Sequence, residues 1–169
     1  MQTTVGAEKY IKKLNIGQPS ALSLHIWDTT GQEKFRSLSP QYYRDADAFV
    51  IVYSISKQAS FDAISDYWLQ SIFNYGPADV EIALVGTWEK DPAMRCISEQ
   101  EICQLKENYP IKIHKELCPE DKGQVESLFQ EITLSLETKK SNVISFSHFS
   151  RIQHSASTLS ALVGPCSKI

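Results

Sequence analysis

The chain reads LSLHIWDTTGQEKFRSL from Leu22 to Leu38, where an apolar segment runs directly into a polar turn. The segment up to Asp28 has the pattern of a β-strand, so Asp28 would stand at the carboxyl end of that strand. A carboxylate there can hold a Mg²⁺-bound water, and Gly31 lets a backbone N–H approach a phosphate closely. Gln32 is placed to orient an attacking water. An ordinary turn containing Asp and Gly remains the alternative.

Strand patterns alternate with helix patterns around this motif. Two short segments with alternating or apolar residues, 7–14 and 22–28, predict a β-hairpin. Near-continuous apolar runs at 48–54 and 81–86 predict buried parallel strands. The predicted strands are Ala7–Leu14, Leu22–Asp28, Ala48–Ser54, Glu81–Gly86 and Ile111–His114. Apolar spacing predicts helices over Ser60–Phe73, Ser98–Asn108 and Val125–Thr138, and Ser98 to Glu101 fits a capping box. This alternation predicts right-handed βαβ units in a three-layer α/β sandwich.

Composition limits the classes of protein to which the chain can belong. Its 169 residues are 42% apolar and 22% charged, which suits one domain with a tail. A net charge of -3 and a pI near 5.8 give no basic field for nucleic acid. The four cysteines lack the close spacing of metal or redox sites, and no apolar run reaches the length of a membrane span. We therefore expect a cytoplasmic protein, peripheral on membranes only if a lipid anchors it.

Serine recurs from Ser141 onward, and the helical pattern fades after Thr138. Such a composition buries too little apolar surface to offset the entropy of ordering. The sequence therefore predicts a folded domain over residues 1–138 and a flexible serine-rich tail over residues 139–169. Ile152, Leu159 and Leu162 would give the tail at most a weak amphipathic turn.

The tract from Trp27 to Ser54 resembles the Rab branch of the Ras-like small GTPases. The switch II signature of that family is a strand followed by Trp, Asp, two variable residues, Gly, Gln and Glu, and this chain has the same order. The Trp is typical of Rabs. Tyr42 and Tyr43 match the tyrosine pair that follows switch II. The resemblance covers residues 3–138 and implies the three-layer P-loop NTPase fold of small G-proteins, with GTP or GDP and Mg²⁺ as ligands.

The resemblance also implies roles for single residues. It makes Gln32 catalytic, because the glutamine orients the attacking water, and Gly31 a donor to the nucleotide. Asp28 and Thr4 would surround Mg²⁺, and Thr4 would also contact the nucleotide. Asp91 is the candidate for reading the guanine base. The alternatives are an ordinary threonine at position 4 and a charged surface loop around Asp91.

Three aromatic residues match a surface that Rab partners recognise. They are Trp27, Phe35 and Tyr43, although Trp27 and Tyr43 would also suit half-buried packing positions. Lys9 stands where Rabs usually place a phenylalanine of this surface. The expected partners are effectors and the exchange and activating factors of Rab proteins.

Parts of the family's nucleotide site are missing or changed. The sequence contains no G-x-x-x-x-G-K-[ST] loop, so the resemblance implies a domain without its first strand, phosphate loop and first helix. In the family that strand lies between the strand ending at Asp28 and the strand beginning near Ala48. We therefore expect two sheet edges without partners, and poor folding. The loops at Thr87–Asp91 and Cys118–Glu120 also depart from the guanine-binding motifs.

Two functions follow from this comparison. The first is a GTP-hydrolysing switch of vesicle traffic that is impaired in this chain, and the second is a nucleotide-independent pseudo-GTPase that binds proteins. Cys166 is the fourth residue from the end of the sequence, as in a prenylation box, which would place the protein on endomembranes. An unmodified tail cysteine is the alternative.

Overall fold

The computed structural model describes residues 7–14, 22–29, 41–88, 92–146 and 158–164. These ranges form a 6-stranded sheet in the order β1-β2-β6-β3-β4-β5. The strands are β1 (Ala7–Leu14), β2 (Leu22–Thr29), β3 (Ala48–Ser54), β4 (Glu81–Thr87), β5 (Ile113–Leu117) and β6 (Thr158–Gly164). β1 and β2 form the predicted antiparallel hairpin, and all other neighbours in the sheet are parallel.

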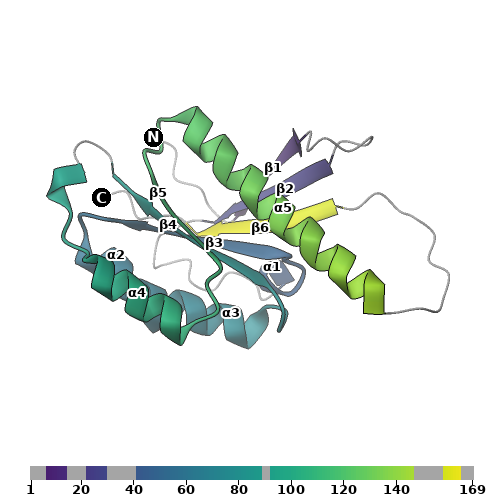
Figure 1. Ribbon diagram of the computed structural model, residues 1–169, viewed down its shortest axis with the longest axis horizontal. Helices are drawn as coiled ribbons and strands as arrows, with labels where there is room; N and C mark the ends of the chain where they lie inside the picture. Colours follow the sequence, from purple (N-terminus) through teal and green to yellow (C-terminus); the bar gives the residue numbers. More distant parts are fainter. Residues whose placement is uncertain (1–6, 15–21, 30–40, 89–91, 147–157, 165–169) are drawn as a thin grey trace.

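Helices cover both faces of this sheet (Figure 1). The helical segments are α1 (Gln41–Arg44), α2 (Gln58–Ala63), the π-helical η2 (Ile64–Trp68), α3 (Leu69–Tyr75), the 3-10 turn η3 (Pro92–Met94), α4 (Glu99–Asn108) and α5 (Lys122–Phe146). Helix α5 buries Leu128, Ile132 and Leu136 against one face of the sheet. The segments from α1 to α4 bury the opposite face. The predicted three-layer α/β sandwich is therefore confirmed.

The centre of the sheet differs from the expectation. Strand β6 lies between β2 and β3, where it pairs in parallel with Ser23–Asp28 on one side and with Ala48–Ile51 on the other (Figure 1, yellow strand). The prediction of two sheet edges without partners is therefore wrong. The C-terminal part of the chain satisfies their backbone hydrogen bonds, which would otherwise be costly to leave unmade.

The prediction of a flexible tail over residues 139–169 is corrected for two parts of it. Helix α5 continues to Phe146 instead of ending near Thr138, and residues 158–164 form β6. A serine-rich composition opposes independent folding, but a strand that adds to existing edges gains hydrogen bonds on both sides. Cys166 lies outside the described residues.

Local sequence signals explain several boundaries. At the start of α4, Ser98 Oγ accepts a hydrogen bond from Glu101 N at 3.3 Å, and Glu101 Oε2 accepts one from Ser98 N at 2.8 Å. The predicted capping box is therefore confirmed. The helix predicted from Ser60 is also present, but it contains the π-helical turn η2. Strand β5 starts two residues later than predicted, at Ile113.

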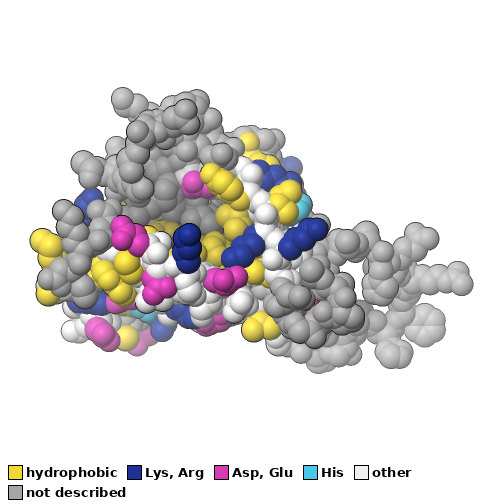
Figure 2. All heavy atoms as spheres, turned by 90° about the horizontal axis from the view of Figure 1, so that it is seen from above, with side chains coloured by type: hydrophobic (Ala, Val, Ile, Leu, Met, Phe, Trp, Pro, Cys, Tyr) yellow, Lys and Arg dark blue, Asp and Glu magenta, His cyan; other side chains and the backbone are white. Residues whose placement is uncertain are grey.

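Ion pairs tie α5 to the sheet. Lys12 Nζ of β1 lies 3.2 Å from Glu126 Oε1, and Lys115 of β5 pairs with Glu131. Figure 2 shows acidic and basic side chains interspersed on the face seen from above Figure 1. Such a surface supplies no single-sign field toward nucleic acid. None of the described helices combines the length and the apolar character needed to cross a membrane.

Candidate functional site

The carboxyl ends of the parallel strands form one edge of the sheet. Strands β2, β6, β3, β4 and β5 point the same way, and they end at Thr29, Gly164, Ser54, Thr87 and Leu117. In open α/β sheets, ligands bind in crevices outside these ends. This edge is therefore where the structure would hold a nucleotide.

Asp28 stands at this edge, as its place in the sequence predicted. It is the penultimate residue of β2, and it lies in register with Glu8 of β1 and Val163 of β6. Its role as a metal ligand stays a prediction, because Thr4, Gly31 and Gln32 lie outside the described residues. Within the described ranges, no group of three or more His, Cys, Asp or Glu side chains is placed to hold a metal ion.

A cleft of about 490 Å³ lies at the same edge, between the ends of β4 and β5 and the start of α5. It is lined by Trp88, Lys115, Glu116, Leu117, Asp121, Gly123, Gln124 and Ser127. Trp88 of the first loop that the family resemblance linked to guanine binding lines this cleft, as does Asp121, which follows the second loop. Asp91, the predicted base-reading residue, lies outside the described residues.

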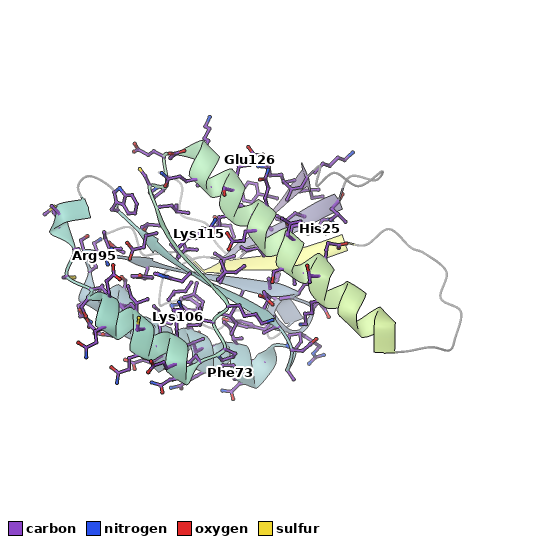
Figure 3. The ribbon with its side chains drawn as sticks, viewed as in Figure 1. His25, Phe73, Arg95, Lys106, Lys115 and Glu126 are labelled. Atoms are coloured by element: carbon purple, nitrogen blue, oxygen red, sulfur yellow. The ribbon has the colours of Figure 1, made fainter. Side chains whose placement is uncertain are left out.

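The charged side chains of this cleft already have partners. Lys115 pairs with Glu131, and Glu116 pairs with Arg95 (Figure 3 labels Lys115 and Arg95). Asp121 Oδ1 accepts hydrogen bonds from Gly123 N at 2.9 Å and from Gln124 N at 3.1 Å, which caps the start of α5. Lys115, the cation of this lining, is already paired, and Asp121 adds negative charge, so the lining is poorly suited to a phosphate.

A part-buried polar contact reaches from β3 to β5 across β4. Tyr53 Oη of β3 lies 3.2 Å from His114 Nε2 of β5, and burial raises the pKa of Tyr53. Burial also lowers the pKa of His114, so its neutral form is favoured. Gly86 of β4 allows this contact, because a Cβ there would lie 2.9 Å from Tyr53 Oη. The contact therefore links β3 to β5, and Gly86 of the strand between them leaves room for it.

The predicted partner surface is only partly exposed. Trp27 is half-buried, and its ring centroid lies 5.2 Å from the ring centroid of Tyr42. Lys9, which is opposite Trp27 on the other strand of the hairpin, places its Nζ 5.3 Å from the centroid of the Trp27 ring. We name Lys9, Trp27 and Tyr42 the hairpin patch. A cation over an indole ring is favourable and holds the lysine in place. Phe35, the third predicted member, lies outside the described residues.

Tyr43 does not belong to that surface in this structure. Its side chain is only 7% exposed, and its ring packs against Phe49 at 5.4 Å and against Tyr75 at 6.0 Å between centroids. Burial raises the pKa of Tyr43 to about 12. The prediction that Tyr43 binds partners therefore does not fit its position in the core, and the neighbouring Tyr42 takes the half-exposed place beside Trp27. The tyrosine pair could not reveal which member faces inward.

Comparisons with known proteins agree with this architecture. Residues 1–138 match the Ras family. The chain is 32% identical over 132 residues to the Ras-related protein Rab-19 of Homo sapiens, a match that covers 76% of this chain and 58% of the relative. It is 32% identical over 137 residues to RABC1 of Arabidopsis thaliana, covering 80% of this chain and 64% of the relative.

A further relative is the Ras-related protein Rab-5B of Plasmodium falciparum, 40% identical over 98 residues, which are 58% of this chain and 46% of the relative. The chain thus spans less than two thirds of the length of these curated relatives. The family match, the Rab relatives and the parallel sheet flanked by helices lead to the same assignment. The chain belongs to the Ras family of small GTPases, as a Rab-like member.

Proposed function

We propose that the chain acts in vesicle-mediated membrane traffic as a Rab-type protein whose GTP switch is impaired. The names of its relatives support the pathway, and the position of β6 supports the impairment. The family resemblance assigns the space between β2 and β3 to the strand that leads into the phosphate loop. In this chain, residues 158–164 occupy that space.

The register of β6 carries this proposal. Val163 lies beside Asp28, and the next residue, Gly164, ends the strand beside Ile51. The segment TLSALVG contains no cation that could neutralise a phosphate at this edge. GTP or GDP and Mg²⁺ would bind by family resemblance, through Thr4, Asp28, Gly31 and Asp91, with Gln32 orienting water. The altered edge would weaken that binding.

Nucleotide binding by the full chain tests this proposal. A fluorescent GTP analogue, titrated in the presence of Mg²⁺, should show no saturable binding at micromolar concentrations, whereas a typical switch protein would bind it tightly. A GDP analogue should behave in the same way. Saturable binding of either analogue at micromolar affinity or better, with turnover of GTP, would show that the switch is intact.

A second candidate function is a pseudo-GTPase that binds proteins without nucleotide. Two observations favour it: β6, a segment of the same chain, completes the sheet, and the hairpin patch presents a half-buried indole beside a lysine. Aromatic residues of this kind contribute strongly to protein interfaces. Since Lys9 replaces the usual phenylalanine, a partner with an acidic residue opposite Lys9 would fit this patch.

Binding to Rab effectors and regulators tests the second function. Trp27→Ala should weaken binding of a recognised partner by about tenfold or more, as for a central aromatic anchor. Phe73→Ala is the matched control, because Phe73 is an exposed aromatic of α3 outside the patch (labelled in Figure 3). Lys9→Glu changes the charge on an exposed residue without altering the core. Equal affinities for all three variants and the original chain would exclude the hairpin patch as the binding surface.

Membrane attachment through Cys166 is a separate proposal. The position of the cysteine in the sequence supports a prenyl group, which by itself gives marginal and reversible binding to a membrane. Mass spectrometry of the C-terminal peptide from cells tests it, with Cys166→Ser as the control. A peptide of unmodified mass would argue against a lipid anchor and against a peripheral position on endomembranes.

A further inference from the structure

Strand β6 joins two parts of the sheet that do not otherwise pair. On one side lies the β1–β2 hairpin, and on the other lie β3, β4 and β5. Neighbouring strands are about 4.8 Å apart, so β2 and β3 are separated by roughly twice that spacing. The space between them therefore holds one strand. We name this space, between Ser23–Asp28 and Ala48–Ile51, the strand slot.

The slot has the properties of a binding site for an extended segment. Both of its walls offer backbone hydrogen-bonding groups to a parallel strand. The β3 wall, Ala48–Ile51, is buried, whereas on the β2 wall only Leu24 is buried and the other residues are half-buried. An empty slot would leave those backbone groups unpaired beside an apolar core. A segment that enters it therefore gains main-chain hydrogen bonds on both sides.

The occupant is suited to this place. TLSALVG carries no charge and no proline, and Pro165 follows it immediately. Ala161 is in register with both Ile26 and Ala48, and Leu162 is in register with both Trp27 and Phe49. A small residue and then an apolar one thus stand at positions that are paired on both sides.

The attachment of this segment to the rest of the chain is long. Residues 147–157 separate the end of α5 from the start of β6, and β6 packs chiefly against β2 and β3. As a general rule, a short flexible linker holds an attached segment at an effective concentration on the order of millimolar. A free copy of the segment at similar concentration should therefore compete with it.

We propose that the strand slot is a peptide-binding site and that residues 158–164 of the same chain are its exchangeable ligand. This inference goes beyond the proposed function, because it requires neither nucleotide binding nor a role in vesicle traffic. The fitting class of ligand is an uncharged, extended segment of about seven residues that binds parallel to β2 and β3. The chain's own C-terminal segment is the occupant to which the register points.

Disulfide trapping in the full chain tests the occupancy of the slot. His25 of β2, labelled in Figure 3, lies in register with Ser160. In a background with the four native cysteines changed to serine, H25C/S160C should form an intramolecular disulfide on mild oxidation, because adjacent parallel strands bring Cα atoms within bonding range. The matched control is S23C/S160C, whose positions are two residues out of register.

Competition by a peptide tests exchange. A synthetic peptide of residues 156–165, at millimolar concentration, should slow disulfide formation in H25C/S160C by about twofold or more, as expected when it matches the local concentration of the tethered segment. The same peptide with Ala161→Pro should have no effect, because proline removes a ladder hydrogen bond.

Four results would overturn the inference. Cross-linking of H25C/S160C no faster than that of S23C/S160C would exclude the observed register. Cross-linking between two molecules instead of within one would assign the slot to another copy's segment. No slowing by the native-sequence peptide would show that β6 is a permanent strand, and equal slowing by both peptides would show that their effect does not come from pairing in the slot.

Discussion

Ala161 of β6 lies in register with Ala48, the first residue of β3, so the last strand in sequence is paired to the middle of the sheet. The same residue is in register with Ile26 of β2. Both halves of the sheet therefore depend on the backbone of one short segment. This arrangement leads to the first prediction.

Ala161→Pro should destabilise the protein by about 3 kcal/mol or more, because proline removes a hydrogen bond from the ladder of a central strand. Thr158→Pro is the matched control: Thr158 is the first residue of β6, where proline is better tolerated. Urea unfolding of both variants measures the difference. Equal unfolding midpoints for the two variants and the original chain would mean that β6 does not contribute to stability.

Gly86→Ala should cost about 1–3 kcal/mol through overpacking. The added Cβ would lie 2.9 Å from Tyr53 Oη and 3.0 Å from Glu116 Cγ, and both side chains would have to move. Tyr53→Phe removes the hydroxyl, so it should recover part of that cost in the double variant. A double variant as unstable as the sum of the single ones would show that the hydroxyl is not the source of the clash. Thermal unfolding followed by circular dichroism measures each variant.

The carboxylate of Glu81 is fully buried at the start of β4. It accepts hydrogen bonds from Lys112 Nζ and from Ser135 Oγ, both at 2.9 Å. Lys112→Met should therefore destabilise the protein by about 1–3 kcal/mol, since the carboxylate would lose its charged partner. Glu81→Gln combined with Lys112→Met should be less destabilising than the sum of the single changes.

Lys57→Met provides the control for the loss of a lysine charge, because Lys57 is exposed and precedes α2. Chemical unfolding should give this variant nearly the original stability. A comparable loss of stability in Lys57→Met and Lys112→Met would show that the buried pair has no special contribution.

Stability should fall as the pH drops below the ordinary pKa of histidine. Burial lowers the pKa of His114 below 6.5, with Lys106 and Arg95 acting in the same direction, while Glu116 and Glu99 oppose them. The unfolded chain therefore takes up this proton at a higher pH than the folded chain does. The stabilising contribution is fully present above about pH 6.5 and is lost as the pH falls toward the lower folded-state pKa.

His114→Gln should remove that part of the pH dependence. The measurement is the urea midpoint from about pH 7.5 to about pH 5, across the range in which histidine titrates. Tyr53→Phe separates the causes: it removes the hydroxyl near Nε2 but keeps the burial, so most of the pH dependence should remain. An unchanged slope in His114→Gln would assign the acid sensitivity to other groups.

Much of the fold could be predicted because its signals are local. The limits of β1 and β3 were predicted from alternating and continuous apolar residues, and the capping box of α4 from Ser98 and Glu101. The switch II pattern around Asp28 predicted the family and the edge of the sheet at which that residue stands. These features depend on residues that are neighbours in sequence, whose propensities and spacing are visible in the chain itself.

The remaining features depend on contacts between distant parts of the chain. Only the packed core decides that Tyr43 is buried while the adjacent Tyr42 lies beside Trp27. The π-helical turn between α2 and α3 likewise has no signal in the apolar spacing of that helix. The predicted roles of Thr4, Gly31, Gln32, Phe35, Asp91 and Cys166 stay predictions, because these residues lie outside the described ranges.

The sequence alone therefore determined the family, the layered α/β architecture and the limits of several strands and helices. The tertiary structure alone decided where the C-terminal segment lies: TLSALVG is too short to be a stable strand by itself, and the serine-rich stretch that contains it favours a solvated tail. It becomes the central strand because β2 and β3, both more than a hundred residues earlier in the chain, present unpaired backbone edges one strand width apart. Hydrogen bonding to two such edges offsets the entropy of ordering, and no local pattern encodes that gain.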